Sequence, residues 1–203
     1  MANHRSPPFL TGIMMQYPTK SIRVWFQDES RFGQKNRISK IWAECGSRPR
    51  MVQQNGFKSG YLYGAVDPLS GEHVGLVSST CDSDFMQRHL NEISRLGGEN
   101  NLVVLIVDGA GWHHSKDLKL PENVVLFFLP PYSPELNPVE RLWLWIKSHH
   151  LSNCIYDDVT AILTKGMKAW KSLNPSIVKS ICNATTILPS WYIASYQAAR
   201  TNL

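Results

Sequence analysis

The segment VVLIVDGAGWHHS, residues 103–115, is the feature that most constrains how this chain can fold. A strand that is apolar at every position is buried on both faces, as in a parallel sheet covered by helices. Asp108 stands where this apolar run ends, and a glycine turn and two histidines follow it. The aspartate either only terminates the strand, because Asp-Gly is a common turn pair, or is held at the strand's end to bind a ligand.

A second strand ends in the same way. Residues 21–30, SIRVWFQDES, are strand-like and reach Asp28 near their end. A helix is expected over 82–96, where apolar side chains fall on one stripe. Strands separated by a helix crossover can lie parallel and adjacent in one sheet. Asp28 and Asp108 would then lie at the carboxyl ends of neighbouring strands. Because neighbouring strands are about 4.8 Å apart, the two carboxylates could share one cation.

The remaining segments complete an α/β order. In sequence they are a strand and turn at 40–52, a hairpin at 61–79, a short turn or helix near 112–117, a second buried strand at 123–129, a proline-broken irregular stretch at 130–138, a helix capped by Asn137, and a helix over about 158–172.

Composition narrows the possible function classes. The net charge of +5 suits a polyanionic partner, although alone it is weak support for nucleic-acid binding. The four cysteines are scattered and form no C-x-x-C pair, which favours reduced thiols over a disulfide frame or a zinc knuckle. The longest apolar runs are too short to span a bilayer, and no secretory signal is visible. The expected location is the cytoplasm, at the nucleoid, with no membrane partner.

The stretch LPPYSPELNPVERLW, residues 129–143, carries the most specific signal. Together with DES after the first strand and DGAGWHHS after the later one, it resembles the Tc1/mariner and bacterial IS630-like transposases. The resemblance covers roughly residues 20 to 150 and implies a ribonuclease-H-like fold, an α/β class with a mixed five-stranded sheet flanked by helices. It implies that Asp28, Asp108 and Glu140 are the catalytic, metal-binding triad. Gly109 stands where the family usually has Asn.

The resemblance also implies an organisation of the chain. Residues 1–20 are expected to be an N-terminal tail or linker, residues 21–175 the catalytic domain, and residues 176–203 a C-terminal extension. The chain is then the downstream half of a split reading frame, a truncated copy or an isolated catalytic domain, because nothing in it resembles a recognition-helix pair.

The residue types fit this chemistry without the family name. Hydrolysis of a phosphodiester needs an activated nucleophile and a stabilised leaving oxygen, and two divalent ions about 4 Å apart supply both. Carboxylates suit Mg²⁺, or Mn²⁺, because these hard cations prefer oxygen ligands. Glu140 has a structural alternative as the third residue of a capping box that begins at Asn137. Glu135, in the proline-rich stretch, is the rival third ligand.

A basic segment follows the first strand. RFGQKNRISK, residues 31–40, is a solvated loop in its plainest interpretation and a phosphate-backbone contact in its functional one. The candidate nucleic-acid-binding residues are Arg31, Lys35, Arg37 and Lys40, with His113 beside the triad.

Three functions compete at this level. The first is a metal-dependent transposase catalytic domain that cleaves and joins DNA, acting on transposon ends and target DNA as a homodimer, with a possible separate helix-turn-helix half. The second is a stand-alone ribonuclease-H-like nuclease that does not transfer strands. The third is an inactive remnant that binds DNA or a partner transposase.

Overall fold

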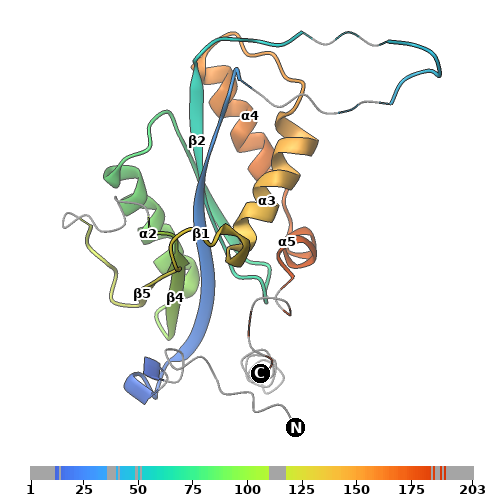
Figure 1. The fold of residues 1–203 in the computed structure, drawn as a ribbon. Helices are drawn as coiled ribbons and strands as arrows, with labels where there is room; N and C mark the ends of the chain where they lie inside the picture. Colours follow the sequence, from blue (N-terminus) through green and yellow to red (C-terminus); the bar gives the residue numbers. More distant parts are fainter. Residues whose placement is uncertain are drawn as a thin grey trace.

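The structure is a computed structural model, and it describes residues 12–13, 15–35, 40, 42–48, 50, 52–109, 118–183, 185, 188 and 190. A five-stranded mixed sheet forms its centre, with helices on both faces (Figure 1). The elements are β1 (Ser21–Gly33), β2 (Ser59–Val66), β3 (His73–Ser78), α2 (Ser83–Gly97), β4 (Asn101–Val107), β5 (Val124–Phe128), the 3-10 helix η2 (Pro134–Leu136), α3 (Pro138–Ile146), the π-helix η3 (Lys147–Leu151), α4 (Val159–Lys171) and α5 (Pro175–Cys182).

The sheet has the strand order β3-β2-β1-β4-β5, so β1 lies in its middle. β1 pairs antiparallel with β2 and parallel with β4, and β4 pairs parallel with β5. The crossover from the β2–β3 hairpin to β4 runs through α2, which allows β4 to lie beside β1 in the same direction. The predicted mixed five-stranded sheet flanked by helices is confirmed, and so is the parallel adjacency of the two strands that lead to Asp28 and Asp108. The prediction that both strands end at their aspartate holds only for Asp108, because β1 continues to Gly33 through its antiparallel pairing with β2.

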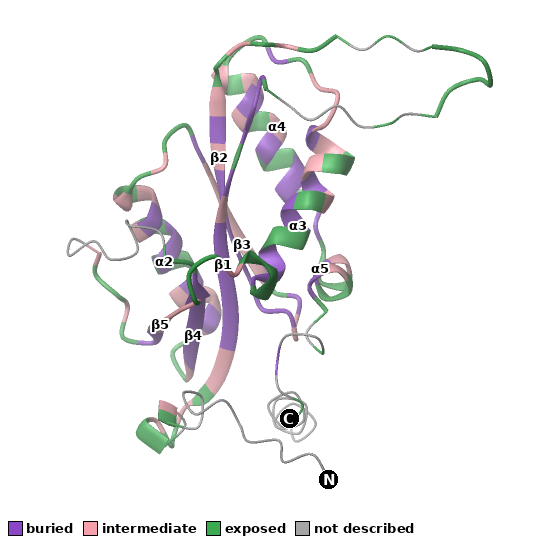
Figure 2. Ribbon diagram, in the orientation of Figure 1, coloured by how far each residue is buried: buried purple, intermediate pink, exposed green. Residues whose placement is uncertain are grey.

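Two apolar cores lie on the two faces of the sheet (Figure 2). β1 contributes to both because successive side chains of a strand point to opposite faces: Phe26 joins the core under α3, α4 and α5, and Trp25 joins the core under α2. β4 is buried from Leu102 to Val107, as its continuous apolar run predicts. Burial on both faces holds the carboxyl ends of β1 and β4 in fixed positions.

Side-chain caps fix where the helices begin. Asp82 accepts a hydrogen bond from the Phe85 backbone N–H, and Asp158 accepts one from the Ala161 N–H. Both are helix-start residues, as their sequence positions predict. Asp67, which the sequence assigns to a hairpin turn, is buried and pairs with Arg23.

Three segments differ from the expectation. In the described part of 40–52 the chain forms no strand, and Trp42 is fully exposed. The apolar residues there give a strand-like pattern, but in the described part of the chain this segment has no neighbouring strand to pair with. The stretch 130–138 holds the short helix η2, because three residues suffice for a 3-10 turn with proline at its first position. The turn or helix expected near 112–117 lies outside the described residues.

The sequence predicts no helix or strand for the C-terminal end of the described residues. α5 packs its Val178 and Cys182 into the same core as α3. Across the described ranges no helix is long and apolar enough to cross a bilayer.

We predict an acid-sensitive stability that depends on His89 of α2. Its side chain is completely buried, and burial lowers the pKa of its imidazole to about 3. An unfolded histidine has a pKa of about 6.5, so the unfolded state binds the proton more readily and stability is lost as the pH falls from 6.5 toward 3. At pH 5 the loss amounts to about 2 kcal/mol.

Urea denaturation at pH 7 and pH 5 measures this loss. In His89→Leu, which keeps an apolar side chain at the site, the difference between the two pH values is expected to shrink by about 2 kcal/mol. An unchanged difference in the variant would assign the acid sensitivity to other groups.

Candidate active site at the carboxyl edge of the sheet

Asp28 and Asp108 occupy matching positions on the two neighbouring parallel strands. The β1–β4 register ends with the pair of Phe26 and Ile106, and continuing it by two residues aligns the two aspartates. Asp28 lies within β1 and is 9% exposed, whereas Asp108 follows the last residue of β4 and is exposed. The parallel pairing therefore brings together two carboxyl groups that are 80 positions apart in the sequence.

Asn137 fixes the start of α3 next to this edge. Its Oδ1 accepts the Val139 backbone N–H at 3.1 Å, and its Nδ2 donates to the backbone oxygen of Gln27 at 3.0 Å. The second bond is buried and connects the helix to β1 at the residue just before Asp28. Pro138 occupies the first helical position, where its missing N–H costs nothing. Glu140 follows in the first turn of the helix.

The capping-box alternative for Glu140 needs its side chain to accept the Asn137 backbone N–H. That N–H instead donates to the Pro134 backbone oxygen at 2.9 Å, inside η2. Glu140 is exposed and lines the same hollow as the two aspartates. The start of α3 is therefore capped without the carboxylate of Glu140.

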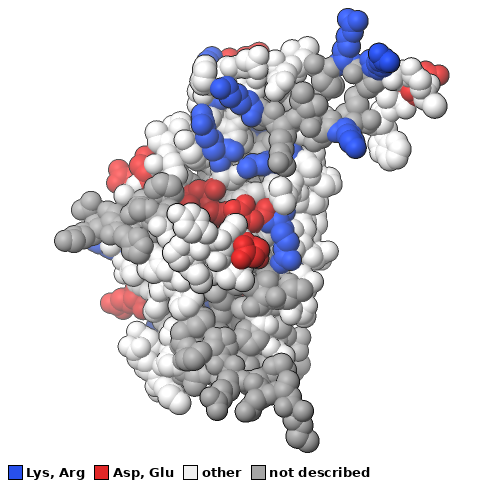
Figure 3. Space-filling model, in the orientation of Figure 1, with Lys and Arg blue, Asp and Glu red and all other residues white. Residues whose placement is uncertain are grey.

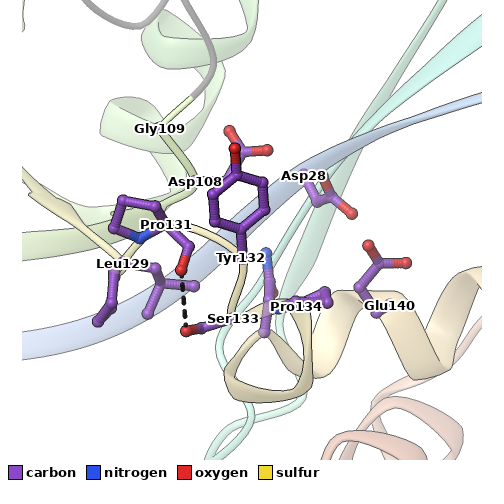
Figure 4. A pocket seen from close by; sticks show the side chains of 11 residues that line it. Asp28, Asp108, Gly109, Leu129, Pro131, Tyr132, Ser133, Pro134 and Glu140 are labelled. Atoms are coloured by element: carbon purple, nitrogen blue, oxygen red, sulfur yellow. Dashed lines mark hydrogen bonds between the residues drawn. The ribbon is translucent and has the colours of Figure 1, made fainter.

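The three carboxyl groups line one cavity of about 400 Å³, together with Gly109, Asn137 and the proline-rich turn 129–134. Figure 4 shows Asp28 and Glu140 directing their carboxyl groups toward the same space from β1 and α3, with Asp108 at the other side. Within the described ranges, no three His, Cys, Asp or Glu side chains gather tightly around a single point. Of the three, Glu140 is near enough to Asp28 for its charge to raise the pKa of the Asp28 carboxyl group.

Burial and charge raise the pKa of Asp28. Desolvation raises it most, the negative charge of Glu140 adds to the rise, and the hydrogen bond from Trp143 opposes it, with a resulting pKa of about 7. A carboxylate that is costly to ionise beside another carboxylate favours a bound cation, which would neutralise both. The site is therefore electrostatically suited to divalent metal.

Two other acids near the edge lie apart from this cavity. Glu29 accepts a hydrogen bond from Gln27 Nε2 at 3.0 Å and lies on the other face of β1, as strand alternation predicts. Glu135, the rival third ligand, is exposed in η2 and is not among the residues that line the cavity.

Of the basic candidates, Arg31 lies in β1 and Lys35 and Lys40 follow the end of that strand. Arg31 and Lys35 line a second hollow of about 150 Å³ together with Lys58, and the Lys35 ammonium lies 4.0 Å from the ring centre of Phe57. Figure 3 shows Lys and Arg side chains above the acidic side chains on one face of the protein. Lys40 is described and exposed. Arg37 and His113 lie outside the described residues.

Sequence reasoning missed several residues of this region. Trp143 donates its indole N–H to Asp28, Tyr132 has a left-handed backbone (φ 58°) beside the cavity, and Lys58 joins the basic hollow. The position of Trp143 inside the specific motif indicated a role near the site. Its large apolar side chain, however, favoured the interpretation that it only packs in the core. Tyr132 lies in the same motif, and no local pattern marks Lys58.

A family model described as DDE superfamily endonuclease matches residues 23–162, which is most of the chain. The chain belongs to this family. The resemblance to the Tc1/mariner and IS630-like transposases, stated from the motifs, is thereby confirmed, as is the assignment to a DDE endonuclease domain.

Curated relatives agree with this assignment. The chain is 48% identical to the uncharacterised protein y4pE/y4sA of Sinorhizobium fredii over 56% of this chain and 84% of that protein. It is 23% identical to the Tc3 transposase of Caenorhabditis elegans over 80% of this chain and 53% of that protein. It is 27% identical to the 39 kDa protein of insertion element IS630 of Shigella sonnei, over 59% of this chain and 36% of that protein. The chain thus spans about half of one element-encoded relative and about a third of the other.

Solved structures of the Mos1 mariner transposase share the fold. Its catalytic domain aligns with a TM-score of 0.56 at 17% identity, covering 96% of this chain and 95% of that one. The Mos1 paired end complex with Mn aligns with a TM-score of 0.60 at 20% identity, covering 91% of this chain and 59% of that one. At these identities the likeness shows the ribonuclease-H-like fold.

We predict that Asp28→Asn stabilises the metal-free protein. The folded-state pKa of Asp28, about 7, is raised above its unfolded value, so its contribution to stability is largest at low pH and is lost as the pH rises through 7. Asparagine cannot ionise, and at pH 8 with chelator the variant is expected to be more stable by about 2 kcal/mol.

The matched control is Asp84→Asn, which removes an exposed carboxylate on α2. Its free energy of unfolding is expected to change by no more than about 0.5 kcal/mol. A destabilised Asp28→Asn at pH 8 would contradict the electrostatic account of the site.

Proposed function

We propose that this chain is the catalytic domain of a DNA transposase that cleaves and joins DNA strands with Asp28, Asp108 and Glu140. The observation that carries the proposal is the convergence of these carboxyl groups, from β1, from the end of β4 and from the first turn of α3, on one cavity. Three carboxylates from distant elements leave the positions between them open for phosphate and water.

The donor set fits Mg²⁺ or Mn²⁺ and two ions in preference to one. All three side chains are hard oxygen donors, and Asp28 has a second carboxylate on either side, so each pair can hold one ion. Asp28, Asp108 and Glu140 would hold the ions, which would supply activation of the attacking oxygen and stabilisation of the leaving oxygen in an in-line displacement.

The chain's own residues hold the substrate strand. Arg31 lies three residues beyond Asp28 on β1, which is about 10 Å by the rise of a strand, and strand alternation places its side chain on the same face as Glu29. With Lys35 and Lys58 it forms a basic surface that can neutralise backbone phosphates next to the one in the cavity. This surface would offset part of the repulsion between the carboxylates and the DNA phosphates.

The proposed reaction has two steps at the same site. In the first, the oxygen of water attacks the phosphorus at the end of the element, and the bond from phosphorus to the 3′ oxygen breaks, which leaves a 3′ hydroxyl. In the second, this hydroxyl attacks a phosphorus of target DNA and displaces the target's own 3′ oxygen. Both are in-line displacements, so one set of carboxylates can serve both.

The wider assembly is proposed as well. The chain spans 53% of the Tc3 transposase. Recognition of the transposon ends is assigned in this proposal to a separate helix-turn-helix half of the transposase. The acting form is a homodimer on DNA, at the nucleoid in the cytoplasm. Sedimentation of the protein with and without end DNA tests the dimer.

Incubation with labelled terminal-repeat DNA and Mg²⁺ or Mn²⁺ tests the function, with Asp108→Asn as the inactive reference. Joined products that need the metal and Asp108 support the transposase. Nicked products without joined products would instead indicate a ribonuclease-H-like nuclease that does not transfer strands. DNA binding without any cleavage would instead indicate an inactive remnant of a transposase.

We predict that Glu140 and Glu135 differ sharply in this assay. Glu140→Gln removes a proposed metal ligand without changing its size, and the cleavage rate is expected to fall about 1,000-fold. Glu135→Gln, five residues earlier and outside the cavity, is expected to stay within about threefold of the parent rate. A large loss of cleavage rate in Glu135→Gln and a small one in Glu140→Gln would identify Glu135 as the third metal ligand.

We predict that Lys35→Ala weakens DNA binding uniformly across sequences. Loss of one phosphate contact is expected to reduce the slope of log affinity against log salt by about 1. Fluorescence anisotropy at several salt concentrations measures it. Lys171→Ala, in the last turn of α4, is the control and should leave the slope unchanged; equal slopes for both variants would remove Lys35 from the DNA surface.

A further inference from the structure

The indole of Trp143 contacts the central carboxylate of the site directly. Its Nε1–H donates to Oδ2 of Asp28 at 2.8 Å, and Trp143 is 2% exposed. An indole N–H is a donor only, so Oδ2 is fixed as an acceptor. The bond joins residues 115 positions apart, and it therefore forms only when α3 has docked on the sheet.

The helix brings this donor and the third carboxylate together. Trp143 follows Glu140 by three residues, and residues three apart are neighbours on a helix surface. Glu140 is exposed to the cavity, whereas Trp143 is buried against the sheet. One helix thus supplies a carboxyl group to the cavity and holds another that β1 supplies.

A glycine makes room for the indole. Gly64 of β2 pairs directly with Asp28 of β1. A Cβ at Gly64 would lie 2.6 Å from Cη2 of Trp143 and 2.9 Å from ring atoms of Trp170, closer than side chains pack. The two indole rings lie 5.9 Å apart, so Trp170 supports Trp143 from its other side. Without a side chain at this point in the sheet, Trp143 can reach Asp28.

We propose that Trp143 is a positioning residue that orients Asp28 for metal binding. The inference rests on the proposed function, because it takes Asp28 as a metal ligand. The bond occupies one side of Oδ2 and holds the carboxyl plane, so that Oδ1 and the remaining lone pair of Oδ2 face the space shared with Asp108 and Glu140. A ligand already oriented loses less rotational freedom when the cation binds.

Replacement of Trp143 by Phe tests this role, because it keeps an aromatic ring and removes the N–H. Calorimetric titration of the full chain with Mn²⁺, without DNA, is expected to give about tenfold weaker binding, the typical cost of losing a partner of a metal ligand. Trp170→Phe is the matched control. It alters the same packing without touching Asp28, and its Mn²⁺ affinity is expected to stay within about threefold of the parent.

A spectroscopic signal separates positioning from packing. The ¹⁵N–¹H indole resonance that is absent from Trp143→Phe belongs to Trp143, and it should shift when Mg²⁺ is added, because its acceptor becomes a metal ligand. If Trp143→Phe fails to fold, 3-benzothienylalanine at position 143, which exchanges the N–H for sulfur, makes the same test with the ring shape kept.

Asp28→Asn distinguishes failure of this inference from failure of the proposed function. If Asp28→Asn loses Mn²⁺ binding while the Trp143 variant binds like the parent protein, the positioning role is wrong and the metal site stands. If Asp28→Asn also binds Mn²⁺ like the parent, the metal site itself is wrong.

Discussion

The hydrogen bond from the Asn137 side chain to the Gln27 backbone oxygen is the contact on which the site depends. It connects the first turn of α3 to β1 across 110 positions of sequence. The same side chain caps the helix, so the point where α3 begins and the point where it meets the sheet are fixed together. Glu140 then lies beside Asp28 because of one buried amide, which has both a donor and an acceptor to use.

The site carries an electrostatic cost in the metal-free protein. The carboxyl group of Asp28 is 9% exposed, and its pKa is raised first by this burial and then by the negative charge of Glu140 on α3. The surrounding fold offsets this cost, since β1 and β4 are buried on both faces and their apolar side chains join two separate cores. The apolar strands supply the stability, and the electrostatic cost is confined to the few carboxyl groups that line the cavity, as is typical of functional sites.

Much of this arrangement could be predicted from local sequence. The apolar run before Asp108 required a doubly buried strand, and its parallel pairing with the strand of Asp28 followed from the helix between them. The caps at Asp82, Asn137 and Asp158 follow from residue types that compete for backbone N–H groups. The bond between Trp143 and Asp28 could not be predicted, because it depends on a glycine in a third element that clears its path. The strand expected within 40–52 was wrong for a similar reason: pairing partners, and not local composition, decide whether a strand forms.

Anomalous diffraction from crystals of the full chain grown with Mn²⁺ tests the central claim most directly, since it locates the ions independently of activity. The account predicts two Mn²⁺ peaks in the cavity, one between Asp28 and Asp108 and one between Asp28 and Glu140. Fully occupied Mn²⁺ peaks elsewhere on the protein, with none in contact with Asp28, would contradict it.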